Sequence, residues 1–378
     1  MSEKRRDNRN RILRTGESQR KDGRYAYKYI DTFGKPQFVY SWKLVPTDKT
    51  PAGKRDDISL REKEKEIQKD LDDGIDPIGK KMTVCQLYAK QIRHRGNVRY
   101  NTKNGRKRLM KLLEEDKLGG CPIDSVKLSD AKEWAIRMKE KGISYKTISN
   151  DKRSLKAAFY TAIQDDCIRK NPFDFQLNTV IEDDTEPKVP LTPAQEESFL
   201  SFAQNDKVYQ KYYDELIILL GTGLRISELC GLTDTDIDFE NRIINVDHQL
   251  LRSAETGYYI ETPKTKSGIR QIPMSEKVYE AFNRVLKRRR GAKAVTIDGY
   301  SNFLFLNRDG YPKTATNYDG MFRGLAKKYN KYHEEALPKV MTPHTLRHTF
   351  CTNMANAGMN PKALQYIMGH SNITMTLN

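Results

Sequence analysis

The sequence has no long apolar run. Its longest apolar stretches, such as Leu216 to Leu220, fall far short of the roughly 20 residues that a helix needs to cross a bilayer. The N-terminal segment MSEKRRDNRNRILR is basic and has no apolar segment behind it, which is not the pattern of a signal peptide or a membrane anchor. We therefore expect no membrane span and no secretion, and a protein that stays inside the cell.

Cysteine is also scarce. The chain has five cysteines, at positions 85, 121, 167, 230 and 351. They lie far apart, form no C-x-x-C pair and are odd in number, which argues against both a disulfide framework and a zinc site. We expect them to be reduced thiols with mainly structural roles.

Acidic residues are too few to balance the basic ones. The 378 residues include 67 Lys and Arg against 50 Asp and Glu, a net charge of +17. Coulomb attraction and counterion release make a polyanion the expected partner, with nucleic acid first. Residues 1–50 alone hold 13 basic and 6 acidic side chains, so we expect the N-terminal end to contact DNA. The length exceeds one ordinary core and predicts two or three domains.

The N-terminal region has the pattern of a small sheet backed by one helix. Residues 24–31 and 37–45 alternate aromatic or apolar with polar side chains, and Gly34 lies between them, which predicts a β-hairpin. Ser59 starts the capping-box sequence S-L-R-E, and apolar residues recur at helical spacing until Gly74. The basic and aromatic side chains are either ordinary strand surface or, as we favour, a DNA-binding surface. The candidates are Arg24, Lys28 and Lys43.

Helical patterning dominates from Thr83 to Arg169. It predicts helices near residues 83–95, 102–115, 129–141 and 144–165. A linker is expected before them at 76–81 and a second one after them at 171–190. The basic helix faces are either solvated surface or a clamp on DNA phosphates, and we favour the clamp. The candidate DNA-binding residues here are Arg106, Lys107, Arg108, Lys146, Lys152, Arg153 and Lys156.

The last region begins with a capped helix, because Thr192 precedes Pro193 in T-P-A-Q. Four separated segments with polar side chains follow. The first, G-T-G-L-R-I-S-E-L, comes after an apolar helix and opens another. It places Arg225 and Glu228 three residues apart on one helical face, where Glu228 can orient Arg225. Arg–Glu pairs at this spacing are also common on helix surfaces.

The second and third segments place polar side chains at helix ends. Thr342 and the following proline cap a helix on which His344 and Arg347 lie one turn apart. The helix amides, the helix dipole and Arg347 together favour a phosphate there. In N-P-K-A-L-Q-Y-I-M-G-H, the glycine ends a short helix and His370 emerges behind it. The alternative is that both histidines are structural partners of helix ends.

The fourth segment, Tyr258 to Met274, reads YYIETPKTKSGIRQIPM. It predicts two strands joined by a Lys-rich, Gly-containing turn, a hairpin from whose tip Lys264 or Lys266 projects. An ordinary polar hairpin tip is the other interpretation.

In this order and spacing, the four segments resemble the tyrosine recombinase (phage integrase) family. The shared motifs are G-T-G-L-R-x-S-E-L, a hairpin lysine, H-x-x-R-H-T and M-G-H. The resemblance extends over the whole chain. With Q-D-D-C-I-R-K-N-P-F-D-F and M-N-P-K-A-L-Q-Y-I-M-G-H, the chain is similar to integrases of conjugative transposons of Gram-positive bacteria.

This resemblance implies a multidomain protein, mainly α-helical with small β elements. Residues 1–76 would form an arm-site DNA-binding domain with a three-stranded sheet and a helix. Residues 82–175 would form a helical, SAM-like domain that binds core sites, and residues 185–378 a mixed α/β catalytic domain. The implied partners are double-stranded DNA at core and arm sites, three further copies of the chain in a tetramer on two duplexes, an excisionase and a host DNA-bending protein. The implied location is the bacterial cytoplasm.

The resemblance also assigns roles in phosphoryl transfer. Arg225 and Arg347 would grip the scissile phosphate and stabilise the charge of the transition state, with Glu228 in support. His344 would assist proton transfer or orient the nucleophile, and His370 would hydrogen-bond the phosphate.

A lysine would supply the proton for the leaving group. Lys264 would protonate the departing 5′-oxygen, and Lys266 is the other assignment. These roles need no metal and no cofactor, which agrees with the lack of a clustered carboxylate or Cys/His ligand set in the sequence.

The family's nucleophile is a tyrosine about nine residues after the last motif histidine. Counted from His370, that is position 379, one past Asn378. Ser371 to Asn378 has the pattern of the start of the helix that would carry it, so truncation or an unseen end of the chain explains the missing tyrosine better than a different chemistry. Tyr366 is the nearest substitute, but its place on the preceding helix favours packing. We expect the 378-residue chain to bind DNA without forming a covalent 3′-phosphotyrosyl link.

Two other functions fit parts of the pattern. A type IB topoisomerase shares the Arg/Lys/Arg/His/Tyr chemistry, although two DNA-binding domains before the catalytic one favour recombination at paired sites. A non-catalytic DNA-binding regulator that retains the fold is the second alternative.

Overall fold

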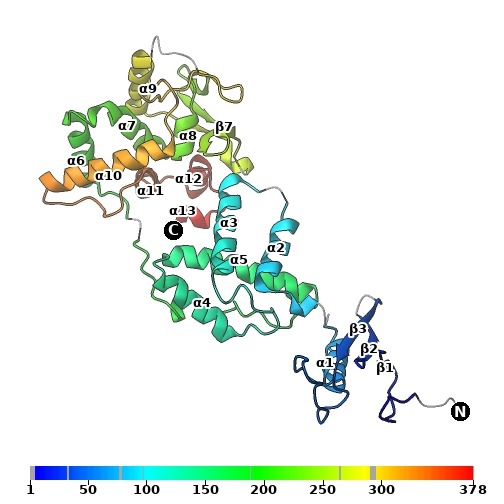
Figure 1. Ribbon diagram of the computed structural model, residues 1–378. Coiled ribbons are helices and arrows are strands. Elements are labelled where there is room, and N and C mark those ends of the chain that lie inside the picture. The colour runs from blue at the N-terminus through cyan, green and yellow to red at the C-terminus, as the bar shows by residue number, and fades with distance from the viewer. Residues whose placement is uncertain are drawn as a thin grey trace. The chain divides into compact units, whose positions relative to one another are not determined.

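The computed structural model describes residues 5–31, 34–75, 79–96, 98–187, 189–263, 265–289 and 295–377. The chain divides into two compact units, residues 1–185 and 186–378, whose elements are labelled in Figure 1. Among the described residues, no helix is both long and apolar enough to cross a bilayer. The division into three domains at 1–76, 82–175 and 185–378 stays a prediction.

The N-terminal part of the first unit is a three-stranded antiparallel sheet with one helix, as expected. Its strands are β1 (Glu17–Gln19), β2 (Tyr25–Ile30) and β3 (Pro36–Ser41), in that order. Alternate tyrosines of β2 pack on α1 (Leu60–Asp72), because side chains two residues apart share a face of a strand. The capping box is also confirmed, since Glu62 accepts a hydrogen bond from the Ser59 amide at 2.9 Å.

The helical part of the first unit has its own apolar core. Its helices are α2 (Val84–His94), α3 (Tyr100–Glu114), α4 (Leu128–Glu140) and α5 (Tyr145–Gln164), each within two residues of the expected bounds. Trp134 on α4 and Phe159 on α5 lie at the centre of this core.

The second linker is shorter than the sequence suggested. Phe173 is buried, with its ring centroid 5.7 Å from Trp134 and 5.4 Å from Phe159. Leu177 and Ile181 belong to the same core. The prediction of a linker from residue 171 is therefore wrong. The apolar residues of this segment pack into the core of the helical part, although prolines and acidic residues lie near them in the sequence.

The second unit combines helices with two small sheets. The helices are α6 (Pro193–Asn205), α7 (Tyr213–Thr222), α8 (Ile226–Gly231), α9 (Glu276–Arg289), α10 (Ala315–Tyr332), α11 (Pro343–Asn356), α12 (Pro361–Met368) and α13 (Thr374–Leu377). The strands are β4 (Ile237–Asp238), β5 (Ile243–Val246), β6 (Gln249–Ser253), β7 (Gly257–Glu261) and β8 (Arg270–Pro273). The apolar helix α7 packs against α9 and α11 in the middle of the core.

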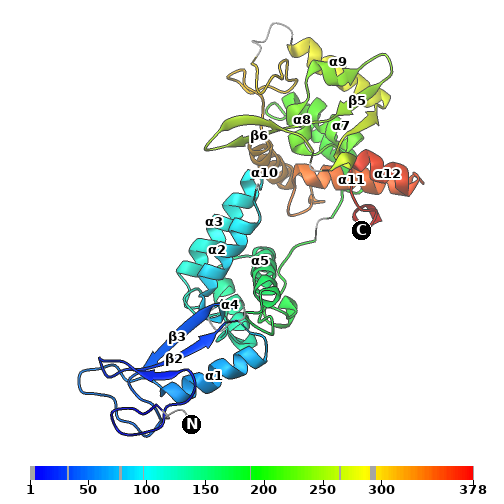
Figure 2. The ribbon, with the colours of Figure 1, turned by 90° about the vertical axis from the view of Figure 1, so that its right-hand side faces the viewer.

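Strand pairing in this unit contradicts one prediction. The runs at 258–274 do not form a hairpin with each other: β7 pairs with β6, and β8 pairs with β5 at the edge of a different sheet. The β6–β7 hairpin extends from the body of the unit in Figure 2. The segment between β7 and β8 is thus a crossover between sheets, and η5 (Lys266–Gly268) lies within it.

Candidate active site

A sharp turn between α7 and α8 presents Arg225. Gly223 ends α7 with φ of 63°, and a Cβ at this position would lie 2.5 Å from the Phe350 ring, so the turn requires glycine. Arg225 follows as the N-cap of α8 in an extended conformation, rather than on a helical face as the sequence suggested. Its side chain is 36% exposed, so its guanidinium can reach a ligand.

Glu228 holds Arg225, as the sequence predicted. One carboxylate oxygen, Oε2, accepts from the Arg225 amide at 2.8 Å, and the other, Oε1, accepts from Arg225 Nη1 at 2.7 Å. The Glu228 side chain is only 3% exposed. Burial alone would raise the pKa of Glu228, but hydrogen bonds from Arg270 and the charges of Arg270 and Arg225 lower it to about 2. Glu228 is therefore ionised at neutral pH.

Arg347 lies on α11 and points into the same region. Its Nη1 donates to the Gly223 carbonyl at 2.5 Å, and its Nη2 donates to the Met368 carbonyl and to His370 Nε2, the latter at 3.1 Å. These contacts use three of the five N–H groups of a guanidinium. Burial, and next the charge of Arg225, lower the pKa of Arg347 to about 9, which leaves it charged at neutral pH.

His370 emerges after α12, which Gly369 ends with φ of 61°. Its Nε2 faces Arg347 Nη2, which can only donate, so Nε2 is the acceptor of the ring. The proton then lies on Nδ1, 3.0 Å from Thr376 Oγ1 on α13. Both nitrogens are thus engaged within the protein, and the ring must exchange one partner before it can donate to a phosphate.

Arg270 is the residue of this cluster that the sequence reasoning missed. It lies on β8 with a fully buried side chain, and it donates to both oxygens of Glu228, at 3.0 and 2.9 Å. A usable signal was present: along Ile269-Arg-Gln-Ile272, strand alternation places Arg270 on the same buried face as Ile272. A charged residue at an inward strand position needs a partner, and Glu228 is that partner.

The cluster carries a net positive charge in a largely water-excluded place. Arg225 and Arg270 bind the Glu228 carboxylate, and Arg347 interacts with it through charge, so the three guanidinium groups and this carboxylate together leave +2. Arg225 Nη2 also donates to the Gly369 carbonyl at 2.9 Å, so α8 and α12 are joined at this point. Such an arrangement is suited to bind an anion and to stabilise further negative charge on it.

The two predicted lysines are placed differently. Lys264 lies outside the described residues. Lys266 begins η5 and is exposed, and the Gly268 carbonyl at the end of this turn accepts a hydrogen bond from Arg270 Nη1 at 3.1 Å. The turn that holds Lys266 is thereby tied to the arginine cluster.

His344 and Tyr366 lie at the edge of the cluster. His344 is exposed one turn before Arg347, and its ring packs edge-to-face on His348 with centroids 4.7 Å apart. Tyr366 is 51% exposed, and its hydroxyl accepts from the Gln271 amide at 3.1 Å. Tyr366 therefore links α12 to β8.

In the N-terminal sheet, the candidate DNA-binding residues lie beside exposed aromatic rings. Lys28 faces Phe38 across β2 and β3, with Nζ 6.0 Å from the ring centroid. The Arg24 guanidinium lies 5.5 Å from the Tyr40 ring and 5.6 Å from the Trp42 ring. These cation–π contacts hold the cations at the surface of the sheet.

Two other candidates are turned into the protein. Lys43 is only 14% exposed and lies 2.9 Å from Asp56. Lys152 donates to the Phe175 carbonyl at 2.5 Å and lies 4.4 Å from the Phe175 ring. These contacts would have to break before either lysine could reach a phosphate.

The other cations of the helical part do not share one face. Arg108 forms an ion pair with Asp151 at 2.5 Å, whereas Arg106 and Lys107 line a cavity of about 570 Å³ beside α2 and α3.

Along α5, the candidates also differ in their surroundings. Lys146 and Arg153 are exposed, and Lys156 is paired with Asp174 at 2.5 Å.

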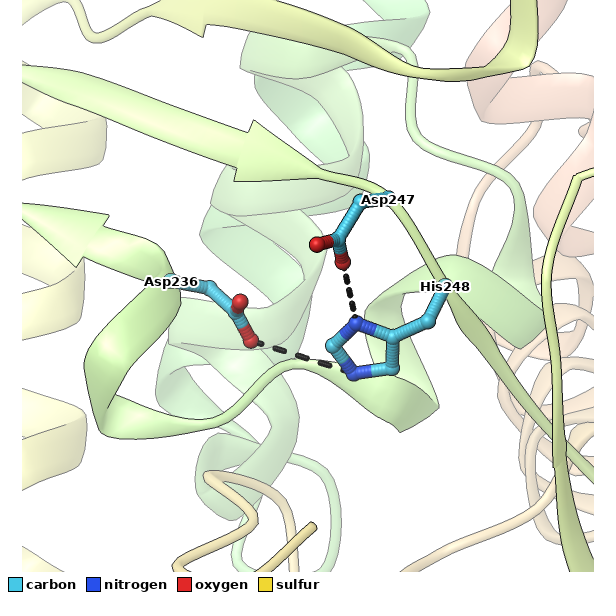
Figure 3. Close-up of side chains that lie close together, drawn as sticks. All are labelled: Asp236, Asp247 and His248. Carbon is cyan, nitrogen blue, oxygen red and sulfur yellow. Dashed lines mark hydrogen bonds and ion pairs between the residues drawn. The ribbon is translucent and has the colours of Figure 1, made fainter. Parts of the chain in front are cut away.

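A second polar cluster, at the other end of α8, consists of Asp236, Asp247 and His248 (Figure 3). His248 Nδ1 lies 2.6 Å from Asp247, whereas Nε2 lies 2.7 Å from the Gly231 carbonyl and 3.9 Å from Asp236. The two carboxylates thus face opposite nitrogens of one ring, and one ion can bind only one nitrogen of an imidazole. This geometry favours a structural role, in which His248 holds the end of α8 through the Gly231 carbonyl, over a metal centre.

Cationic side chains also gather at a cavity of about 770 Å³ near the start of α7 and the end of α9. Neither Arg225 nor Arg347 lines this cavity. Its basic lining residues are Lys211, Arg288, Arg289, Arg308 and Lys313.

The buried His370 predicts a pH-dependent stability. Burial, and next the charges of Arg347 and Arg225, lower its pKa to about 4, whereas an unfolded histidine titrates near 6.5. Between these values the unfolded chain binds more protons, so the free energy of unfolding should fall as pH drops from 6.5, by about 2 kcal/mol at pH 4.5. Urea titrations of the chain and of His370→Gln over this pH range measure the change in the free energy of unfolding. An unchanged pH slope in the variant would contradict the prediction.

Two family models match the chain. The one described as the phage integrase family matches residues 190–378, and the one described as the DNA binding domain of tn916 integrase matches residues 1–71. Over all 378 residues the chain is 71% identical to the transposase from transposon Tn916 of Enterococcus faecalis, and it covers 93% of that protein.

Solved structures are similar as well. The Tn1549 transposon integrase (aa 82–397, R225K) in complex with a circular intermediate DNA is 78% identical, with a TM-score of 0.76 over 79% of this chain and 94% of that one. A Tyr-to-Phe variant of that integrase, in complex with transposon right end DNA, gives the same values. A lambda integrase dimer bound to a core site is 16% identical with a TM-score of 0.52, over 78% of this chain and 93% of that one, a likeness of fold alone.

Proposed function

Because the chain belongs to the phage integrase family, we propose that it is a site-specific recombinase that integrates and excises a conjugative transposon. The observation that carries the proposal is the cluster of Arg225, Arg347 and His370. Together with Arg270 and Glu228, this cluster has a net charge of +2. A phosphodiester has a charge of −1, and its pentacovalent transition state carries more. A site with excess positive charge therefore binds the transition state more tightly than the ground state.

The two arginines have different tasks. Arg225 is the more exposed, and its guanidinium is held by Glu228 through Nη1 and by the Gly369 carbonyl through Nη2. We assign its other N–H groups to one non-bridging oxygen. Arg347 is buried and fixed by two backbone carbonyls, and it offers its other N–H groups to the second oxygen. Rigid donors of this kind cost no reorganisation during the reaction.

The covalent step needs a nucleophile and a proton donor. We assign the nucleophile to a tyrosine at position 379, directly after the printed residues. Its hydroxyl proton passes to His344, its oxygen bonds to phosphorus, and the bond from phosphorus to the 5′-oxygen breaks. Lys264, or alternatively Lys266, gives a proton to the departing 5′-oxygen. The resulting 3′-phosphotyrosyl link is reversed by a 5′-hydroxyl of the partner duplex. A polypeptide that ends at Asn378 would bind DNA but not cleave it.

The first unit supplies the DNA contacts in this proposal. The match of residues 1–71 to a DNA-binding domain supports arm-site binding, and we assign contacts with the arm site to Arg24 and Lys28. In the helical part, the exposed Lys146 and Arg153 are better placed to reach core-site phosphates than Lys152. A homo-tetramer on two duplexes, assisted by an excisionase and a host DNA-bending protein in the bacterial cytoplasm, completes the proposal.

Strand exchange between two duplexes tests this function. A chain in which tyrosine follows Asn378 is mixed with two labelled duplexes that carry the transposon ends, and joined products are separated on a denaturing gel. A recombinase yields joined strands. Relaxation of supercoiled plasmid without joined strands would favour a type IB topoisomerase, and binding without any cleavage would favour the DNA-binding regulator.

A further inference from the structure

We propose that Arg270 positions Arg225 for phosphoryl transfer by holding Glu228. The inference rests on the proposed function, since it assigns a task within the same site. Arg270 has a fully buried side chain and so does not touch DNA. It is a positioning residue that acts through its neighbours.

The geometry at Glu228 supports this role. Arg270 Nη1 and Nη2 donate to Oε1 and Oε2 of Glu228 at 3.0 and 2.9 Å, a two-pronged pair between planar groups that fixes the carboxylate. Arg225 donates to the same two oxygens through only one guanidinium nitrogen: its Nη1 donates to Oε1 at 2.7 Å, and its backbone amide donates to Oε2 at 2.8 Å. Because Arg270 occupies the two-pronged position, Arg225 cannot, and the N–H groups that Arg225 does not give to Glu228 or to the Gly369 carbonyl are left for an anion.

The Arg270 guanidinium also joins three segments of the site. Arg270 Nε donates to the Ile367 carbonyl at 2.5 Å, near the end of the helix that precedes His370. Nη1 also donates to the Gly268 carbonyl at 3.1 Å, in the turn that contains Lys266. A Cβ at Gly369 would lie 3.1 Å from Arg270 Nη1, so the approach is close. Arg270 therefore sets the spacing between α8, the lysine-bearing turn and α12.

The positive charge of Arg270 also affects how Glu228 binds Arg225. Without Arg270, Arg225 would be the main positively charged partner of the buried Glu228. Both carboxylate oxygens would then be free to bind the Arg225 guanidinium in a two-pronged pair. The Arg225 guanidinium would then rotate toward Glu228 and away from the phosphate. The net charge of the cluster would also fall from +2 to +1, which weakens its attraction for a transition state of higher negative charge.

A lysine at position 270 tests the proposal, because it keeps the charge and removes the planar fork. In a chain that carries the tyrosine at 379, Arg270→Lys is expected to slow covalent complex formation about 100-fold, the effect of a displacement of about 1 Å of a catalytic group. Affinity for a duplex with a neutral methylphosphonate at the cleavage position should change less than twofold. Arg284→Lys is the matched control, since Arg284 also pairs with a buried carboxylate, Asp214, outside the site, and it should retain the full rate.

A double-mutant cycle separates positioning from simple support of the fold. If Arg270 acts through Glu228, Arg270→Lys should have a much smaller effect in a Glu228→Gln background than in the parent. Equal losses in both backgrounds would mean that the contacts to Ile367 and Gly268 alone matter, and the proposal would be overturned. A parent rate in Arg270→Lys would overturn it as well. Melting temperatures of all variants identify any loss of folding.

A binding assay keeps this inference distinct from the proposed function. The 378-residue chain is titrated with a duplex that has either a phosphodiester or a neutral methylphosphonate at the cleavage position. Arg270→Lys should lower the preference for the charged linkage, as Arg225→Ala should. A preference that Arg225→Ala removes and Arg270→Lys leaves intact would reject the role of Arg270 alone. No preference in the parent chain would reject the proposed site and this role together.

Discussion

A chain that carries a tyrosine at position 379 is expected to become covalently attached to DNA, whereas the 378-residue polypeptide is expected to bind DNA without this attachment. The physical reason lies in α13 (Thr374–Leu377), which ends two residues before that position and is hydrogen-bonded to His370 through Thr376. Because His370 also contacts Arg347, a tyrosine at 379 is expected close to the arginine cluster. The measurement uses a nicked duplex that loses a short strand after cleavage, so the covalent complex accumulates and is counted on a denaturing protein gel.

Phenylalanine at position 379 is the control for this experiment, because it lacks only the hydroxyl oxygen. It should support the same DNA affinity and give no covalent complex. A complex formed by the 378-residue chain itself would contradict the assignment. In that case Tyr366, whose side chain is half exposed on α12, is the residue to replace by phenylalanine.

Replacement of Arg225 by alanine, in a chain that carries this tyrosine, is expected to slow covalent complex formation by about 10²- to 10³-fold, or about 3 to 4 kcal/mol of transition-state stabilisation. Arg225→Lys should recover only part of the rate, because an ammonium group cannot present two parallel N–H donors to the phosphate. Single-turnover rates at saturating DNA measure the effect on the chemical step alone. A loss of DNA affinity with an unchanged rate would contradict the assigned role.

Arg347 offers a contrast that helps to interpret this result. Its guanidinium is buried and binds the carbonyls of Gly223 and Met368, so Arg347→Ala leaves these acceptors unpaired and should also lower the melting temperature. Arg225 is partly exposed and is expected to lose activity with little loss of stability. Comparison of the two variants therefore separates phosphate binding from support of the fold.

Signals that lie within a few residues were readable from the sequence. The caps at Ser59 and Thr192, the Thr342 start of α11 and the αL glycine at 369 all appear where the residue pattern placed them. Each depends on hydrogen bonds between residues close in sequence. For the same reason, the pairing of Arg225 with Glu228 three residues later was predictable.

Features that depend on distant partners were misread or missed. The runs at 258–274 look like one hairpin, but each strand has a more favourable neighbour elsewhere, β6 for β7 and β5 for β8. Phe173 looked like part of a linker because its partners, Trp134 and Phe159, lie on helices that only the fold brings together. Strand pairing and core packing are set by tertiary context that one-dimensional patterns do not contain.

The hydrogen bond between His370 Nδ1 and Thr376 Oγ1 has a consequence for the order of events. As long as α13 keeps this position, the imidazole proton is committed to the threonine and the other nitrogen to Arg347. A movement of α13 that displaces Thr376 would break this bond. If the proposed nucleophile at position 379 moves with α13, its delivery would be coupled to the release of the histidine proton for a substrate phosphate.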